Sequence, residues 1–251
     1  MKIVTWNCQG ALRKKTETAD SLNADILIIQ ECEDPSKSTL TYKDWAGEYL
    51  WTGKSKNKGI GIFSRTGRAI THCNWAGEFK IGGINSNHPA AQWTTSDLEL
   101  FLPCLIDNRI TVLAVWTKQA ASPIFGHIGQ FWKYLQIHRT DLANEKTITI
   151  GDFNSSSIWD KKDRWWNHSD VVNELEKIGL KSLYHSQFNE EQGRENTPTF
   201  YMYRKPEKPF HIDYAFMSGD LLDKSKLTIG PKSEWLEYSD HMPLIVDIAT
   251  E

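Results

Sequence analysis

The sequence is poor in cysteine and has no paired cysteine motif. It contains four cysteines among 251 residues, none of them in a CxxC pair, and the histidines outside the motifs described below lack HxxxH spacing. Zinc ribbons and thioredoxin-like redox sites depend on such spacings, so we predict neither. Cys8 and Cys32, which directly follow Asn7 and Glu31, are expected to be small buried thiols.

Long apolar runs are also missing. The chain begins with MKIVTWN, which lacks the apolar stretch of a signal peptide, and no run approaches membrane-spanning length. We therefore expect no membrane span and a cytoplasmic protein with reduced thiols.

Basic residues are not in excess. The 29 Lys and Arg residues are outnumbered by 32 Asp and Glu residues, so the net charge is -3. This balance argues against a globally basic protein that coats nucleic acid. It does not exclude a nuclease, because the local field at a site matters more than the summed charge.

What remains is the composition of an ordinary soluble domain, with one unusual residue. Hydrophobic residues make up 39% and charged residues 24%, and there are 11 tryptophans. We expect some of these indoles in the core and others in an aromatic binding wall. The length allows one large α/β unit, and the chain shows no repeat or low-complexity linker, so we predict a single domain over residues 1–251.

The hydrophobic pattern predicts more strands than helices. Runs of apolar residues predict strands over 2–6, 26–29, 60–63, 98–106, 110–116, 147–150, 199–203, 212–217 and 244–248. Helical spacing predicts helices over 12–23, 128–142 and 171–178. Residues 187–197 and 204–209 are expected to be loops. Hairpins mixed with strand–helix–strand units favour two packed β-sheets with helices outside, an α/β sandwich, over a doubly wound parallel sheet.

Short polar signatures lie at or beside the ends of these apolar runs. They are WN at 6–7, QE at 30–31, GDFN at 151–154, HIDY at 211–214 and SDH at 239–241, with a weaker GIGIFS at 59–64. A sheet would bring these ends to one mouth. Carboxylates together with Asn and His suit a hard cation such as Mg²⁺ and a phosphate ester. The pattern therefore predicts metal-assisted hydrolysis of a phosphoric ester.

These five signatures, in this order, resemble those of the endonuclease/exonuclease/phosphatase superfamily, which includes DNase I and exonuclease III. The resemblance spans the whole chain and implies a four-layer α/β/β/α sandwich of two mixed sheets. It also implies Mg²⁺, with Mn²⁺ as the alternative metal. Glu31 matches the principal metal ligand, and Asp240 matches a carboxylate that supports this ligand or binds a second metal.

The resemblance also implies roles for the other polar residues. Asp152 would activate or orient the attacking water, and Asn154 would hold the phosphate or the water. Asn7 would orient Glu31, a phosphate oxygen or a metal-bound water without adding charge, so it counts among both the catalytic and the metal-site candidates. Asp213 would hold one ring nitrogen of His241, which then acts either by stabilising charge on the phosphoryl oxygens or as a general base.

Two departures from the family pattern stand out. Trp116 lies near the place of a usual His or Tyr and is a candidate for substrate contact, although an indole can only donate a hydrogen bond. Lys118 and Gln119 are the candidates for contact with phosphate in place of the usual residue. Gln9 stands where abasic-site endonucleases often have an acid, and their aromatic-rich loop before the IDY segment has no clear match. We therefore do not assign the abasic-site branch.

The stretch after GDFN, SSSIWDKKDRWWNH at 155–168, is distinctive. Lys161 and Arg164 could contact phosphates while Trp165 or Trp166 stacks on a base. Alternatively, the tryptophans cover the edge of the sandwich and the charges are solvated.

The sequence thus predicts a Mg²⁺-dependent phosphodiesterase, in the first place a nuclease whose substrate is nucleic acid. One alternative is a phosphatase or phosphodiesterase for a small molecule or lipid head group. Another is a catalytically silent binding protein on the same fold, which the set Asn7, Glu31, Asp152, Asn154, Asp213 and His241 argues against.

Overall fold

The computed structural model describes residues 1–86, 88–120 and 124–249, and it contains two large mixed sheets. The first sheet has the order β15 (Ser225–Ile229), β16 (Leu244–Ile248), β1 (Lys2–Asn7), β2 (Ile26–Cys32), β4 (Lys58–Ser64) and β3 (Tyr49–Ser55). The second has the order β11 (Leu180–Ser182), β14 (Asp213–Ser218), β10 (Thr147–Asp152), β9 (Ile110–Trp116), β8 (Phe101–Ile106) and β5 (Ile70–His72).

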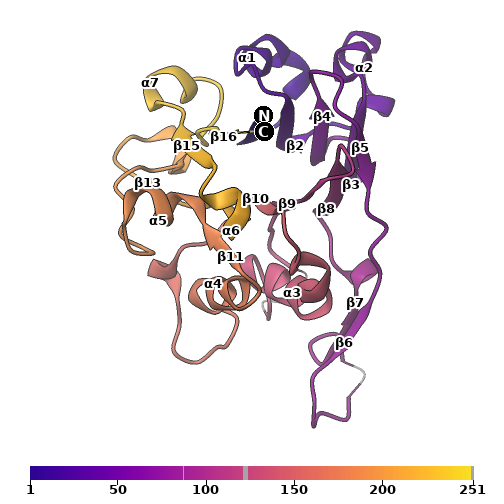
Figure 1. Ribbon diagram of the computed structural model, residues 1–251, viewed down its shortest axis with the longest axis vertical. Helices are drawn as coiled ribbons and strands as arrows, with labels where there is room; N and C mark the ends of the chain where they lie inside the picture. Colours follow the sequence, from indigo (N-terminus) through magenta and orange to yellow (C-terminus); the bar gives the residue numbers. More distant parts are fainter. Residues whose placement is uncertain (87, 121–123, 250–251) are drawn as a thin grey trace.

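Helices lie outside both sheets, as Figure 1 shows. Helices α1 (Thr16–Asp20), α2 (Leu40–Ala46) and α7 (Lys232–Trp235) lie beyond the first sheet, and α3 (Ile128–Leu142) and α4 (His168–Lys177) lie beyond the second. The short helices α5 (Leu183–Phe188) and α6 (Gly219–Leu222) flank the strands of the C-terminal half. The predicted four-layer α/β/β/α sandwich is confirmed.

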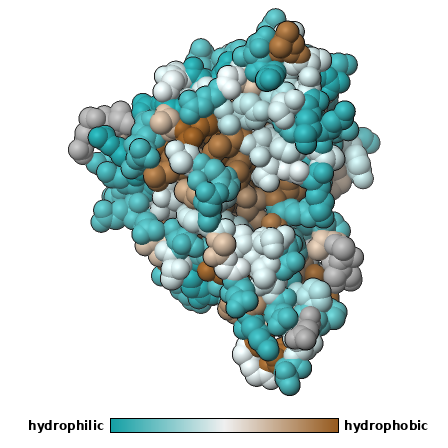
Figure 2. Space-filling model, turned by 90° about the vertical axis from the view of Figure 1, so that its right-hand side faces the viewer, coloured by the Kyte–Doolittle hydropathy of each residue, from teal (hydrophilic) through white to brown (hydrophobic). Residues whose placement is uncertain are grey.

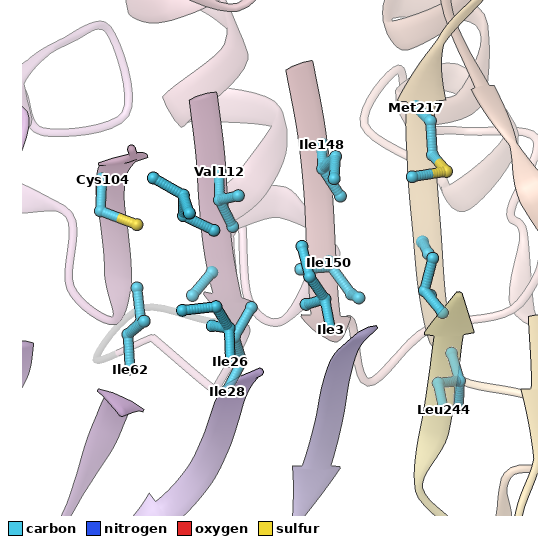
Figure 3. Packing of buried hydrophobic residues seen from close by; sticks show 14 of the residues in the cluster. Ile3, Ile26, Ile28, Ile62, Cys104, Val112, Ile148, Ile150, Met217 and Leu244 are labelled. Atoms are coloured by element: carbon cyan, nitrogen blue, oxygen red, sulfur yellow. The ribbon is translucent and has the colours of Figure 1, made fainter. Parts of the chain in front are cut away.

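Side chains alternate between the two faces of each strand, and those on the inward faces form the core between the sheets. In β1, Ile3 belongs to this core, whereas Val4 and Trp6 belong to the core under the helices of the first sheet. In β10, Ile148 and Ile150 face the same inter-sheet core, and Figure 3 shows their side chains pointing toward those of the first sheet. Each fully buried isoleucine contributes about 1.5–3 kcal/mol to stability. The same alternation continues to the ends of β1 and β10. It places their next inward-facing side chains at the edge of the sandwich where these strands end, which we call the mouth between the sheets.

The edge strands β3 and β5 lie at the same side of the sandwich. Figure 2 views the molecule from this side and shows hydrophobic surface across the middle of the face, with hydrophilic residues around it. Leu50 and Ile110 are partly buried and pack against the inter-sheet core. The hydrophobic core therefore reaches toward the surface at this edge.

Several predicted elements are shorter than expected. The predicted helix over 12–23 is a 3-10 turn, Leu12–Lys14, followed by α1, because Ala11 and Lys15 have non-helical backbones. The strand predicted over 98–106 begins at Phe101, since Leu100 has a φ of 63°. The strand predicted over 199–203 is only β12 (Phe200–Tyr201), because Tyr203 turns the chain at a φ of 58° toward β13 (Pro209–Phe210).

The sequence pattern missed other elements. Besides β13 they are β3, β5, β11, β15, α2, α5, α6, α7 and the hairpin of β6 (Glu78–Lys80) and β7 (Gln92–Thr94). Most are short, so they show too few periods to be recognised. The predicted loop over 187–197 begins inside α5 and otherwise contains no helix or strand.

The buried cysteines agree with the expectation from the sequence. Cys8 and Cys32 are fully buried free thiols. Burial raises the pKa of the Cys8 thiol to about 12, so it is a poor nucleophile. Within the described residues, no helix combines the length and the apolar character needed to span a membrane.

Candidate active site

Asp152 lies at the centre of the mouth between the two sheets. Its side chain is fully buried and follows Ile148 and Ile150 on the inter-sheet face of β10. Asp152 Oδ2 accepts hydrogen bonds from Asn7 Nδ2 at 2.9 Å and from Asn154 Nδ2 at 2.8 Å, and Oδ1 accepts one from the Asn154 backbone amide at 2.8 Å. The carboxylate is therefore held by donors from both sheets.

The GDFN sequence produces this arrangement through its backbone. Gly151 has a φ of 145°, and a Cβ at this position would lie 2.0 Å from the Val115 carbonyl oxygen, so only glycine fits. Asn154 has a φ of 44°, a left-handed conformation that Asn tolerates. Phe153 points away from Asp152 into the core under α3 and α4.

Glu31 reaches the mouth because of a β-bulge. Simple alternation in β2 would place it with Leu27 and Ile29 on the helix side. Instead Glu31 has a φ of 64°, and the pairing with β4 shifts register between Gln30 and Cys32. Its Oε1 lies 3.5 Å from Asn7 Nδ2, and its Oε2 accepts a hydrogen bond from Lys58 Nζ at 2.5 Å. The bulge therefore redirects the carboxylate toward Asn7.

His241 and Asp213 form the other half of the site. His241 Nδ1 lies 3.0 Å from Asp213 Oδ2, and its Nε2 lies 3.9 Å from Asp152 Oδ2. Thr199 Oγ1 donates a hydrogen bond of 2.7 Å to Asp213 Oδ2. The ligand atoms of Asp152, Asp213 and His241 all lie within 4.8 Å of one another. The imidazole thus lies between two buried carboxylates.

This arrangement shifts both ionisation equilibria. Burial alone lowers the pKa of His241, but the Asp213 and Asp152 carboxylates outweigh it and raise that pKa to about 10. Burial, assisted by Asp213, raises the pKa of Asp152 to about 7 against the opposing effect of His241. His241 is therefore a cation at neutral pH, and Asp152 is a carboxylate of raised basicity.

The charge of His241 can be tested directly. In the metal-free protein we expect its imidazole to stay protonated through neutral pH and to titrate near 10. Because this value exceeds the ordinary 6.5 of an unfolded histidine, the stabilisation is complete below pH 6.5 and is lost as pH rises through 10. Ring nitrogen chemical shifts measured by NMR across this range check the value. Asp213→Asn should lower it, and titration near 6.5 in the intact protein would contradict the assignment.

Two sets of residues could hold a metal ion. Glu31 and Asp240 offer carboxylate oxygens and Asn7 offers a carboxamide, and burial, assisted by Glu31, raises the pKa of Asp240. Such an all-oxygen set fits a hard divalent cation. In the second set, Asp152, Asp213 and His241, the imidazolium offsets one of the two carboxylate charges and occupies the space between them. The first set, which contains no cation of its own, therefore fits a metal better.

The chain after β9 contains the candidates for phosphate contact. Trp116 is 3% exposed, lies in the inter-sheet core and pairs with Asp152 across the two strands. This burial argues against the predicted substrate contact by Trp116. Lys118 and Gln119 are exposed, and Lys118 Nζ lies 4.4 Å from the Trp116 ring centroid. These two side chains remain available to a ligand.

Part of the segment after GDFN makes contacts within the protein. Arg164 lies over the Trp166 ring at 4.5 Å and bonds to Asn167, the capping residue of α4. Trp166 packs against Phe125. Trp165 is 59% exposed and the Lys161 side chain is also exposed, so these two keep the predicted role of substrate contact.

The sequence reasoning missed an aromatic wall beside the imidazole. The Phe200 ring lies 4.6 Å from the His241 ring, Phe210 lies 6.4 Å from Phe200, and Trp159 lies 5.2 Å from Phe210. The hairpin of β12 and β13 brings these rings together. The aromatic residues around the IDY segment were the available signal.

Several solved structures share this fold. The 3′ phosphatase NExo from Neisseria, bound to a product DNA hairpin, superposes with a TM-score of 0.70 at 18% identity over 100% of both chains. An AP endonuclease from Archaeoglobus fulgidus gives 0.64 at 16% identity, also over 100% of both chains. Truncated TDP2 from Caenorhabditis elegans gives 0.63 at 15% identity, over 99% of this chain and 97% of its own.

Comparison of the sequence with models of protein families identifies the family of this chain. No curated protein sequence matches the chain. The family model described as "Endonuclease/Exonuclease/phosphatase family" matches residues 4–241, which include every signature from WN to SDH. The chain belongs to the endonuclease/exonuclease/phosphatase family.

Proposed function

We propose that the protein is a divalent-cation-dependent phosphodiesterase that acts on nucleic acid. The observation that carries this proposal is the convergence of Asp152, Asp213 and His241 within 4.8 Å at the mouth between the sheets, with Asn7 and Asn154 bonded to Asp152. A binding protein without catalysis has no need of a buried, fully hydrogen-bonded arrangement of this kind.

Each residue of the site has its own role in the hydrolysis. Asp152 accepts a proton from the attacking water, which its raised pKa near 7 permits at neutral pH. Asn7 and Asn154 fix the carboxylate in place. The imidazolium of His241, held by Asp213, stabilises negative charge as it develops on the phosphoryl oxygens. Because the pKa of His241 is raised, this role is favoured over that of general base.

Glu31, Asp240 and Asn7 would hold the divalent cation. When bound, the cation would polarise a phosphoryl oxygen and offset its charge. Lys58 forms the ion pair with Glu31 in the protein alone, so a cation arriving at Glu31 competes with the Lys58 ammonium.

Two of the structural relatives indicate nucleic acid as the substrate. One is described as a 3′ phosphatase with a product DNA hairpin and another as an AP endonuclease. The aromatic wall of Phe200, Phe210 and Trp159 beside His241 offers rings on which bases stack. A phosphatase for small molecules is the second candidate, and the modest net charge of -3 favours it over a tight binder of polymers.

One panel of substrates separates these possibilities. Single-stranded DNA, duplex DNA, RNA and an aryl phosphodiester are each incubated with Mg²⁺, with Mn²⁺ and with a chelator. We expect metal-dependent cleavage of at least one polymer. Cleavage of the aryl ester alone would favour the small-molecule candidate, and no hydrolysis under any condition would overturn the proposal.

Replacing Glu31 by Gln tests the metal site. Removing one carboxylate charge from the ligand set should weaken Mg²⁺ binding by at least about 10–100-fold, the loss typical when even a ligand's partner is removed. Activity should fall with it while the fold stays intact. Isothermal titration calorimetry measures the affinity, and Glu17→Gln on the exposed side of α1 serves as the matched control. Equal metal binding by the Glu31 variant and the wild type would remove Glu31 from the site.

A further inference from the structure

A large cavity adjoins the catalytic mouth without being part of it. It has a volume of about 1010 Å³ and lies between the β6–β7 hairpin, helix α3 and the chain that follows β9. Its lining includes Lys118 and Gln119 from the chain after β9, and Trp93, Phe125 and Lys133 from its opposite walls. Pockets of this size enclose drug-sized ligands, so it can hold a nucleotide unit.

Lys133 is the unusual residue of this cavity. It is only 8% exposed, although lysine is almost never fully buried unless it is paired. Its Nζ lies 4.6 Å from the ring centroid of Trp93 and 5.0 Å from that of Phe125. Among the described residues it has one hydrogen-bond acceptor, the Pro89 carbonyl oxygen at 2.8 Å, and no carboxylate within ion-pair distance.

The position of the Lys133 ammonium is well defined. Trp93 Nε1 donates a hydrogen bond of 3.1 Å to the Lys133 carbonyl oxygen, which ties the ring under the ammonium to helix α3. A buried charge whose direct contacts are neutral is costly. Burial lowers the pKa of Lys133, and the Asp97 carboxylate opposes this effect only in part. An anion entering the cavity would supply a counter-charge in direct contact with the ammonium.

The acidic residues Glu78, Asp97 and Glu99 line the cavity, and the last two form contacts with residues other than Lys133 and Lys118. Glu99 forms an ion pair with Lys54. Asp97 accepts hydrogen bonds from the Thr94 backbone and hydroxyl group at 2.8 and 2.9 Å. The ammonium groups of Lys133 and Lys118 therefore remain available to contact an anion.

The cavity and the catalytic mouth share a wall. The Thr117 amide donates to the Asp152 carbonyl oxygen at 3.0 Å, and the Thr117 carbonyl oxygen accepts from Asn154 Nδ2 at 3.0 Å. The next two residues, Lys118 and Gln119, line the cavity. Three extended residues span at most about 10 Å, and a nucleic-acid strand in a duplex has a phosphate about every 3.4 Å along the axis. A strand reacting at Asp152 can therefore place a nearby phosphate in the cavity.

We propose that this cavity binds a second phosphate of a single-stranded nucleic-acid segment, a few nucleotides from the reacting phosphate, with Lys133 as its buried cation and Lys118 at the entrance. The proposal rests on the proposed function for the nature of the substrate. A single strand is specified because a cavity of about 1010 Å³ admits a nucleotide but not a duplex.

Binding in the presence of a chelator tests this proposal without turnover. The probe is a fluorescein-labelled thymidine oligonucleotide of about eight nucleotides, followed by anisotropy at several salt concentrations. Lys133→Met keeps the apolar stem and removes the charge, so the affinity should fall about tenfold, the effect of one charge-assisted contact. The slope of log affinity against log salt should decrease by about 0.7, the value for one phosphate on a single strand. Lys181→Met, at an exposed position of β11, should change neither.

A second comparison uses hydrolysis. For each variant, kcat/KM for the oligonucleotide is divided by kcat/KM for bis(4-nitrophenyl) phosphate. This ratio should be about tenfold lower in Lys133→Met and in Lys118→Gln than in the wild type. In Lys133→Arg, which keeps the charge, the ratio should lie between the Lys133→Met value and the wild-type value. A merely structural lysine would lower the melting temperature and leave the salt slope unchanged, and that outcome overturns the proposal. If the wild type binds the probe with the expected lysine dependence yet hydrolyses no phosphoric ester, the proposed function fails and the cavity assignment stands.

Discussion

Replacing Asp152 by Asn is expected to lower kcat by about 10²–10⁴-fold, the usual contribution of a positioned general base. The carboxylate is fully buried and accepts hydrogen bonds from Asn7 and from two groups of Asn154. An amide has the same shape but cannot take the proton of water. Steady-state kinetics on the substrate found in the panel measure the loss, and calorimetry should show a smaller change in metal affinity.

The control for this variant is Asp163→Asn, an exposed carboxylate in the loop before α4, which should keep full activity. Circular dichroism verifies that both variants fold. If Asp152→Asn abolished metal binding while the rate at saturating metal stayed normal, Asp152 would be a metal ligand rather than the proton acceptor.

The second large effect concerns His241 and Asp213 together. His241→Ala should lower kcat by about 10²–10³-fold, because the imidazolium faces the developing charge. Asp213→Ala should cost nearly as much, since it removes the carboxylate 3.0 Å from His241 Nδ1. The double variant should be no worse than the poorer single variant, because both residues act as one unit.

The double-mutant cycle needs its own checks. Asp213→Asn is made alongside Asp213→Ala, because Thr199 Oγ1 donates to this carboxylate and would lose its acceptor in the alanine variant. His72→Ala, on the exposed edge strand β5, controls for loss of a histidine elsewhere. Losses that multiply in the double variant would show that His241 and Asp213 contribute independently.

The parts of the site that follow from strand ends could be predicted from sequence. Asn7 and Asp152 end rows of buried side chains in β1 and β10, and these apolar rows are visible as runs of hydrophobic residues. The order of the short signatures then indicated the family, which the match over residues 4–241 confirms. The assigned catalytic and metal-binding roles stay predictions.

The parts that depend on long-range packing could not be predicted. The bulge at Glu31 arises where β2 pairs with β4, and the ion pair with Lys58 joins residues 27 positions apart. Nothing in the local sequence specifies either contact. The burial of Trp116 likewise depends on packing between the two sheets.

The hydrogen bond between Asn7 and Asp152 and the pairing of Asp213 with His241 both cross from one sheet to the other. The core between the two sheets consists of apolar packing, which has no preferred direction. A core substitution that slid one sheet by even half an ångström would separate these partners long before it unfolded the chain. Catalytic activity is therefore sensitive to the alignment of the two sheets. Variants with substitutions remote from the mouth can be inactive while remaining well folded.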